Sequence, residues 1–85
     1  MPEISRFYGI IVFMNFRDHL PAHIHAWYNE YKAIVTIEEG IVKGEMPLKA
    51  LRLIHQWMDL HGEELLIDWE KAQNGRTLDK ISPLN

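Results

Sequence analysis

The sequence predicts an α+β fold: an antiparallel β-meander of three to four strands, followed by one long or two shorter C-terminal helices packed on one face of the sheet. Two patterns predict this class. Short runs of β-branched and aromatic residues fill residues 8–46, and apolar residues recur every three or four positions from Pro47 onward. The chain has 85 residues, which suits one hydrophobic core, so residues 1–85 are expected to form a single domain.

The strands are predicted in order along the first half of the chain. The run YGIIVFMNF, residues 8–16, is expected to form the first strand after a leading loop. A loop fixed by Pro21 follows, and then HIHAWY and YKAIVTI, residues 23–28 and 31–37, are expected to pair as a hairpin. Asn29 and Glu30 would form its turn, because asparagine tolerates the positive φ of a tight turn. A weak fourth strand, IVKGEM, is expected at residues 41–46.

Helical spacing begins where the strand pattern stops. Pro47 suits a first helical turn, Asn74 and Gly75 suit a stop, and Gly62 is where one helix could become two. The stripe of core-facing residues comprises Leu51, Ile54, Trp57, Met58, His61, Leu65, Trp69 and Ala72. Among these, His61 is expected to be a hydrogen-bonded core or hinge residue, whereas His55 is expected on the surface. Disorder is expected only in the terminal SPLN segment.

Composition limits the classes of function. The net charge of −3 argues against a strong, salt-dependent hold on nucleic-acid phosphates, so nucleic acid is expected as a substrate rather than as a tightly held ligand. No apolar run approaches the roughly 20 residues that span a bilayer, and the N-terminus lacks the layout of a signal peptide. The absence of cysteine fits a reducing compartment. A cytoplasmic location with no membrane partner is therefore expected.

The predicted hairpin register divides the sheet into two faces. A turn at residues 29–30 places apolar pairs on one face, which the helices should cover: Tyr28 with Tyr31, Ala26 with Ala33, and Ile24 with Val35. The opposite face carries a mixed set, which suits solvent or a ligand: His25 with Ile34, His23 with Thr36, and Trp27 with Lys32. Alternation along the first strand sends a further set to this open face: Ile11, Phe13, Asn15 and Arg17.

The segment RDHLPAHIHAWY contains the candidate catalytic residues His23, His25, Asp18 and Arg17. The histidines titrate near neutrality, Asp18 could orient them, and Arg17 could stabilise developing negative charge. Phosphodiester cleavage without metal or cofactor is one reaction that such a set could carry out. The residues also allow other interpretations: imidazoles that line an exposed surface, or a zinc site in which His19 or Asp18 joins the histidine pair.

A non-catalytic function is a further interpretation of the open face. Its apolar members would form a patch of the kind that often binds a partner protein: Ile11, Phe13, Trp27 and Ile34. The same face could therefore hold both a site and its inhibitor. Neither composition nor periodicity identifies a partner or an oligomeric state.

Three segments carry a resemblance that runs essentially from end to end: MPEISRFYGIIVFM, DHLPAHIHAWYNEYKAIVTIEEG and MPLKALRLIHQWMDLHGEELLIDWEKAQNG. The chain resembles the bacterial domain-of-unknown-function family 4160 (DUF4160). The family's D-x-x-P-x-H-x-H-A pattern falls on Asp18, Pro21, His23, His25 and Ala26. Further matches lie in the second half of the chain, at His61, Glu64, Leu65 and Trp69. The resemblance implies that Asp18, His23 and His25 are the signature positions.

The resemblance also implies a biological setting. Members of this family are often encoded beside another small protein, an arrangement similar to that of toxin–antitoxin modules, with this type as the presumed toxin. A cognate small antitoxin-like protein is therefore expected as a partner, with RNA or a nucleotide as the substrate. The sequence departs from the family pattern at four positions: Ala22 replaces a usual proline, Ile24 a phenylalanine, Asn29 a glycine and Gly62 a basic residue.

Overall fold

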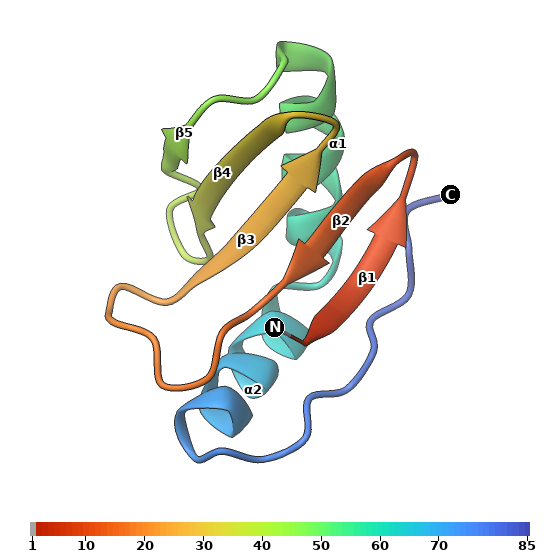
Figure 1. Cartoon of the computed structure of the whole chain (residues 1–85). Helices are drawn as coiled ribbons and strands as arrows, with labels where there is room; N and C mark the ends of the chain where they lie inside the picture. The colour runs from red at the N-terminus through yellow and green to blue at the C-terminus, as the bar shows by residue number, and fades with distance from the viewer. Residues whose placement is uncertain (1) are drawn as a thin grey trace.

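The computed structural model describes residues 2–85, which form a five-stranded antiparallel sheet and two helices. The strands follow one another in the order β1-β2-β3-β4-β5, so the sheet is a meander. Figure 1 shows α1 behind the sheet and α2 beyond the end of the sheet where β2 leaves and β3 begins. The elements are β1 (Glu3–Phe7), β2 (Ile10–Phe13), β3 (His23–Tyr28), β4 (Tyr31–Thr36), β5 (Val42–Gly44), α1 (Leu48–Leu60) and α2 (Gly62–Gln73).

The α+β class is confirmed, but the sheet has one more strand than the three to four predicted. The leading segment is a strand rather than a loop, and it pairs with β2 from Phe7↔Ile10 to Glu3↔Phe13. Tyr8 and Gly9 connect the two strands with φ of 50° and 81°, which is the tight turn of a hairpin. Tyrosine is uncommon at positive φ, so the residue pattern does not predict this turn.

The predicted register of the β3–β4 hairpin is confirmed at each pair, from Tyr28↔Tyr31 to His23↔Thr36. Asn29 adopts the positive φ of 54° that the turn requires. The centre of the apolar face of the sheet is buried against the helices, with Ile10, Val12, Ile24, Ala26 and Val35 all 0% exposed, whereas Tyr28 and Tyr31 beside the turn are half-buried. The choice of covered face is therefore also confirmed.

The helical region divides into two at His61, next to Gly62. His61 bonds to Glu64, Nδ1 to Oε1, at 2.6 Å, and it lies 5.6 Å from the Trp57 ring, which confirms its prediction as a hydrogen-bonded hinge residue. Trp57, Met58 and Trp69 lie in the core as predicted. The prediction that His55 lies on the surface is wrong, because its side chain is half-buried and its Nε2 donates to the Gly40 carbonyl at 3.0 Å.

The C-terminal segment, expected to be disordered, packs along the outer edge of β1. The Ile81 amide donates to the Ile4 carbonyl at 2.8 Å, and the Trp57 indole donates to the Ser82 carbonyl at 2.8 Å. Ile81 and Leu84 are buried. The segment therefore completes the core at one end of the sheet. Among residues 2–85, no helix has the length and apolar character needed to cross a membrane.

Candidate functional site

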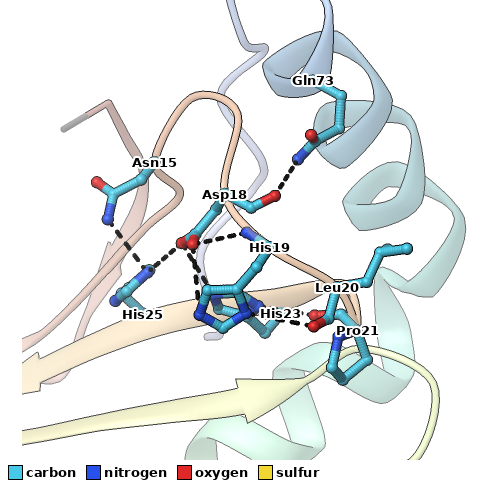
Figure 2. A network of polar contacts seen from close by, with 8 residues as sticks. All are labelled: Asn15, Asp18, His19, Leu20, Pro21, His23, His25 and Gln73. Atoms are coloured by element: carbon cyan, nitrogen blue, oxygen red, sulfur yellow. Dashed lines mark hydrogen bonds and ion pairs between the residues drawn. The ribbon is translucent and has the colours of Figure 1, made fainter.

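The connection between β2 and β3 holds the Asp18 carboxylate against two histidines. One oxygen, Asp18 Oδ2, accepts from His23 Nε2 at 2.9 Å and from His25 Nε2 at 3.1 Å. Figure 2 shows the carboxylate hanging from the connecting loop over both rings, which rise from β3. These two histidines are next-nearest neighbours on a strand, so their side chains leave the same side of the sheet.

His23 is the buried member of this cluster. Its side chain is 2% exposed, and the ring lies 5.2 Å from the Trp69 ring of α2. The ring donates through Nδ1 to the Pro21 carbonyl at 2.8 Å as well as through Nε2 to Asp18. Both ring nitrogens thus face oxygen atoms that can accept a hydrogen bond, so His23 is held in one orientation against Asp18. The prediction that His23 lies on an open face is wrong, because the loop and α2 cover the start of β3.

His25 is the member that reaches the surface, with 17% of its side chain exposed. The ring stacks on Phe13 with centroids 4.8 Å apart, and the Asn15 side-chain amide lies 3.3 Å from Nε2. The predicted approach of Asn15 to the histidines is thus confirmed. The contact with the ionised carboxylate is the stronger of the two, so Nε2 carries a proton and Nδ1 is the basic nitrogen.

His19 lies on the other side of the carboxylate and is largely exposed. Its Nε2 is 3.7 Å from Asp18 Oδ1, its backbone amide donates to that same oxygen at 2.9 Å, and its ring is 5.3 Å from the His23 ring. The sequence suggests a role for His19 only as a metal ligand. The cluster therefore presents two accessible imidazoles, His25 and His19, on either side of one carboxylate.

Hydrogen bonds keep Asp18 ionised. Burial by itself would raise the pKa of this carboxyl, but hydrogen bonds from the His25 ring, the His19 amide and the His23 ring lower the pKa to about 2. The loop is also tied to α2, because the Gln73 side-chain amide donates to the Asp18 carbonyl at 3.1 Å. Gln73 was not predicted as part of the site, and no local pattern marks it.

Arg17 is the predicted site residue that the fold separates from the others. Its φ is 54°, its amide donates to the Ala72 carbonyl at 3.2 Å, and its guanidinium lies against Gly75 after the end of α2. Within residues 2–85, this guanidinium forms no hydrogen bond or ion pair with the cluster. The structure thus brings together Asp18, His23 and His25, and it places Arg17 at the end of α2.

The same three residues have the arrangement of a metal-ligand set. One ligand atom each from Asp18, His23 and His25 lies within 4.8 Å of the others. The bond from His23 Nδ1 to a backbone carbonyl is the contact that usually orients a ligating histidine with Nε2 toward the ion. These residues could therefore hold a divalent cation of the zinc type.

Comparison with known protein families shows a match over most of the chain. The model of the family described as Domain of unknown function (DUF4160) matches residues 9–70, which include the whole cluster and most of α2. No curated protein and no solved structure matches the chain.

Proposed function

The chain belongs to the DUF4160 family, and from this premise we propose that it is the small cytosolic toxin component of a bacterial toxin–antitoxin module. We propose that it cleaves RNA, or acts on a nucleotide, by histidine acid–base chemistry. The observation that supports this chemistry is the shared Asp18 oxygen, which bonds one buried and one accessible histidine. The toxin setting is supported by the family resemblance.

The three residues have different roles in this proposal. His23 is a positioning residue, because it is buried, its bond to the Pro21 carbonyl orients the ring, and its bond to Asp18 holds the carboxylate. Asp18 accepts a hydrogen bond from the Nε2–H group of His25, which leaves the unprotonated Nδ1 to act as the general base. The general acid is His19, whose exposed ring lies on the far side of Asp18 and donates a proton in the reaction. Arg17 has no part, because its guanidinium lies at the end of α2.

The proposed reaction needs only these groups and the RNA itself. His25 takes the proton of a ribose 2′-hydroxyl, and the 2′-oxygen forms a bond to the adjacent phosphorus. The bond from phosphorus to the 5′-oxygen breaks, and that oxygen takes a proton from His19. The products are a 2′,3′-cyclic phosphate and a 5′-hydroxyl, so no water or redox partner is consumed. DNA lacks the 2′-hydroxyl and is not a substrate of this reaction.

Cleavage of a labelled RNA by purified protein tests the chemistry. His25→Ala is expected to lower the rate by about 100-fold or more, the usual contribution of a positioned base. His55→Ala is the matched control, because His55 bonds to Gly40 outside the cluster. Both variants are first checked for the wild-type circular dichroism spectrum. Two results would refute the mechanism. One is equal cleavage by His25→Ala and the wild type, and the other is cleavage of a strand of the same base sequence that has 2′-deoxyribose at every position.

Expression in a bacterial host tests the toxin role. Induction of the wild type is expected to arrest growth with loss of intact RNA, whereas induction of His25→Ala at the same protein level is expected to do neither. Growth arrest that persists with His25→Ala would separate toxicity from this site. Normal growth with the folded wild type would reject the toxin role.

A bound metal is the second candidate for the same cluster, supported by the 4.8 Å convergence of the three ligand atoms. This candidate predicts zinc or another divalent ion in the purified protein at close to one ion per chain. It also predicts that a chelator removes activity and that the ion restores it. Full RNA cleavage by protein free of metal would exclude it and would leave the metal-free reaction.

Exposed apolar side chains support binding of a partner protein. In the alternative of a non-catalytic interaction domain, such binding would be the whole function of the chain. Leu60, Leu66 and Ile67 are 66%, 39% and 54% exposed at the junction of the helices and on α2. We propose this surface for the cognate antitoxin-like protein. Leu66→Glu together with Ile67→Glu is expected to abolish co-purification with the neighbouring gene product and to leave RNA cleavage unchanged.

A further inference from the structure

We infer that the open face of the sheet binds an unpaired RNA strand and delivers it to His25. This inference rests on the proposed function and names its substrate class. The face is the side of the sheet turned away from the helices, in front of α1 in Figure 1. Two rows of paired residues cross it: Arg6, Ile11, Trp27 and Lys32 in the first, and Phe13, His25, Ile34 and Lys43 in the second.

Aromatic rings lie at the centre of this face. Phe13 packs between its two neighbours, stacked on the His25 ring at 4.8 Å and edge-on to the Trp27 ring at 4.9 Å. Phe13 is itself buried, but Trp27 and His25 remain partly exposed. An exposed ring held in place by a second ring offers a rigid surface for base stacking, as in other sheet proteins that bind single strands.

The charges on this face differ from those of the whole chain. The chain has a net charge of −3, yet the open face carries Arg6, Lys32 and Lys43 against Glu3, which is already bonded to Arg6. Lys32 and Lys43 form no ion pair within the part of the chain that the structure describes. The Lys32 amine lies 4.9 Å from the centroid of the Trp27 ring, where it can move from the ring to a phosphate.

A shallow hollow connects these lysines with the proposed general base. Its volume is about 280 Å³, and its lining comprises His25, Trp27, Lys32, Ala33, Ile34 and Lys43. This space is smaller than a pocket for a multi-ring cofactor and suits a single nucleotide on an open groove. His25 therefore belongs both to the Asp18 cluster and to the hollow. A base stacked on Trp27 would place its neighbouring phosphate beside Lys43 and His25.

The chemistry of the hollow favours an unpaired strand over other occupants. A duplex hides the faces of its bases, so it could not use the Trp27 ring. An apolar protein surface would bury Lys32, Lys43 and His25 without counter-charges, which is costly. Only two free lysines are available, in keeping with the weak phosphate grip expected of an acidic chain. A neighbouring hollow that contains Glu30 and Glu45 beside Lys32 repels phosphate, so the strand is directed toward Lys43.

Binding is tested apart from cleavage by using a probe that cannot be cut. The probe is a fluorescein-labelled single-stranded RNA of about 10 nucleotides that carries 2′-O-methyl groups, and anisotropy reports its binding at low salt. Trp27→Ala is expected to raise the Kd at least fivefold, as loss of one stacked base does. Lys32→Gln with Lys43→Gln is expected to raise the Kd and to lower the slope of log K against log salt by about 1.4, which is about 0.7 for each lost phosphate contact on a single strand.

The controls lie outside the open face. Tyr8→Ala removes an aromatic side chain that is 59% exposed at the β1–β2 turn, and Lys49→Gln removes an exposed lysine of α1. Both are expected to bind the probe as the wild type does. Both substituted lysines are exposed, so the double lysine variant folds even if Trp27→Ala does not.

Several outcomes would overturn the inference. These are absence of saturable probe binding, unchanged binding by the lysine variant, or equal competition by duplex RNA. If the probe does not bind but a purified protein partner loses affinity for the lysine variant, the face belongs to that partner. The proposed function fails separately. Probe binding that depends on Trp27, without any RNA cleavage, would support RNA binding by the open face and reject the acid–base chemistry.

Discussion

At the scale of single residues, the hydrogen bond between Asp18 and the buried His23 links the stability of the fold to the site. The carboxylate accepts bonds from two histidine rings and one amide, and this lowers its pKa from 3.8 to about 2. A lowered pKa in the folded state means that the carboxylate stabilises the fold above pH 3.8 and that this stabilisation disappears as the pH falls toward 2.

Asp18→Asn tests this linkage. The variant is expected to lose about 2 kcal/mol in the free energy of unfolding near pH 6, since a shift of one pKa unit corresponds to about 1.4 kcal/mol. The difference from the wild type should shrink as the pH falls from about 5 to 2. Denaturant unfolding at several pH values measures it. A deficit that stays constant down to pH 2 would mean that the loss comes from packing.

Asp68 presents the opposite case, a buried carboxylate that opposes folding at neutral pH. Burial raises its pKa, with a smaller contribution from the Asp79 carboxylate. Its Oδ1 accepts from the Asp79 amide at 2.9 Å, whereas Oδ2 is buried with no partner among the described residues. A raised pKa in the folded state means that this group favours folding at low pH and that the stabilisation is lost as the pH rises through the folded-state value.

Asp68→Asn is therefore expected to stabilise the protein at pH 7 by on the order of 1 kcal/mol, because it removes an uncompensated buried charge. The gain should vanish near pH 3, where the wild-type carboxyl is protonated. The exposed Asp59→Asn on α1 is the control and should change the free energy of unfolding little at either pH. A loss of stability in Asp68→Asn at pH 7 would show that the lone oxygen binds a group that asparagine cannot replace.

At the scale of elements, the β2–β3 loop carries the site and depends on α2 for its position. The loop crosses from one strand to the next, and its contacts with the helix are few: the Gln73 amide to the Asp18 carbonyl at 3.1 Å, and the Arg17 amide to the Ala72 carbonyl at 3.2 Å. Figure 2 shows Gln73 reaching from the helix to the backbone of the loop. Loss of this bond should release the loop while leaving the catalytic side chains intact.

Gln73→Ala is expected to cost about 1 kcal/mol of stability and to speed hydrogen exchange in residues 14–22. If the site acts as proposed, RNA cleavage should fall several-fold with a changed pH profile, because Asp18 no longer holds His25 in one orientation. Gln56→Ala on the exposed face of α1 is the control. Exchange in the loop that matches the wild type would show that the Arg17 contact alone fixes it.

The predictability of these elements follows the range of the interactions that define them. The β3–β4 register was predictable because a two-residue turn fixes it, and the helices because their period is local. The β1–β2 hairpin was missed because Tyr8 forms its turn at positive φ.

In the site, Asp18, His23 and His25 are close in sequence and were predicted together. The burial of His23 was not, because Trp69 approaches it from α2. Arg17 was misplaced because alternation was extended past the end of β2, at Phe13.

At the scale of the whole molecule, the C-terminal segment covers the outer edge of β1. The sheet is an open meander whose first strand would otherwise expose its outer edge, and an exposed edge invites association with other chains. The segment in residues 76–85 runs along that edge in Figure 1. Its bonds to Ile4 and Trp57 fasten it at the point where sheet and α1 meet.

Truncation after Lys80 is expected to destabilise the domain by about 3–5 kcal/mol, the sum for two buried aliphatic side chains, Ile81 and Leu84, and the lost bond of the buried Trp57 indole. This is a large part of the stability of a small domain. The truncated protein should melt at a much lower temperature, fluoresce like a protein with a solvated tryptophan, and self-associate through β1. Deletion of Asn85 alone, an exposed residue, is the control. A truncated chain that stays monomeric with the wild-type melting temperature would show that α1 and β1 are stable without this segment.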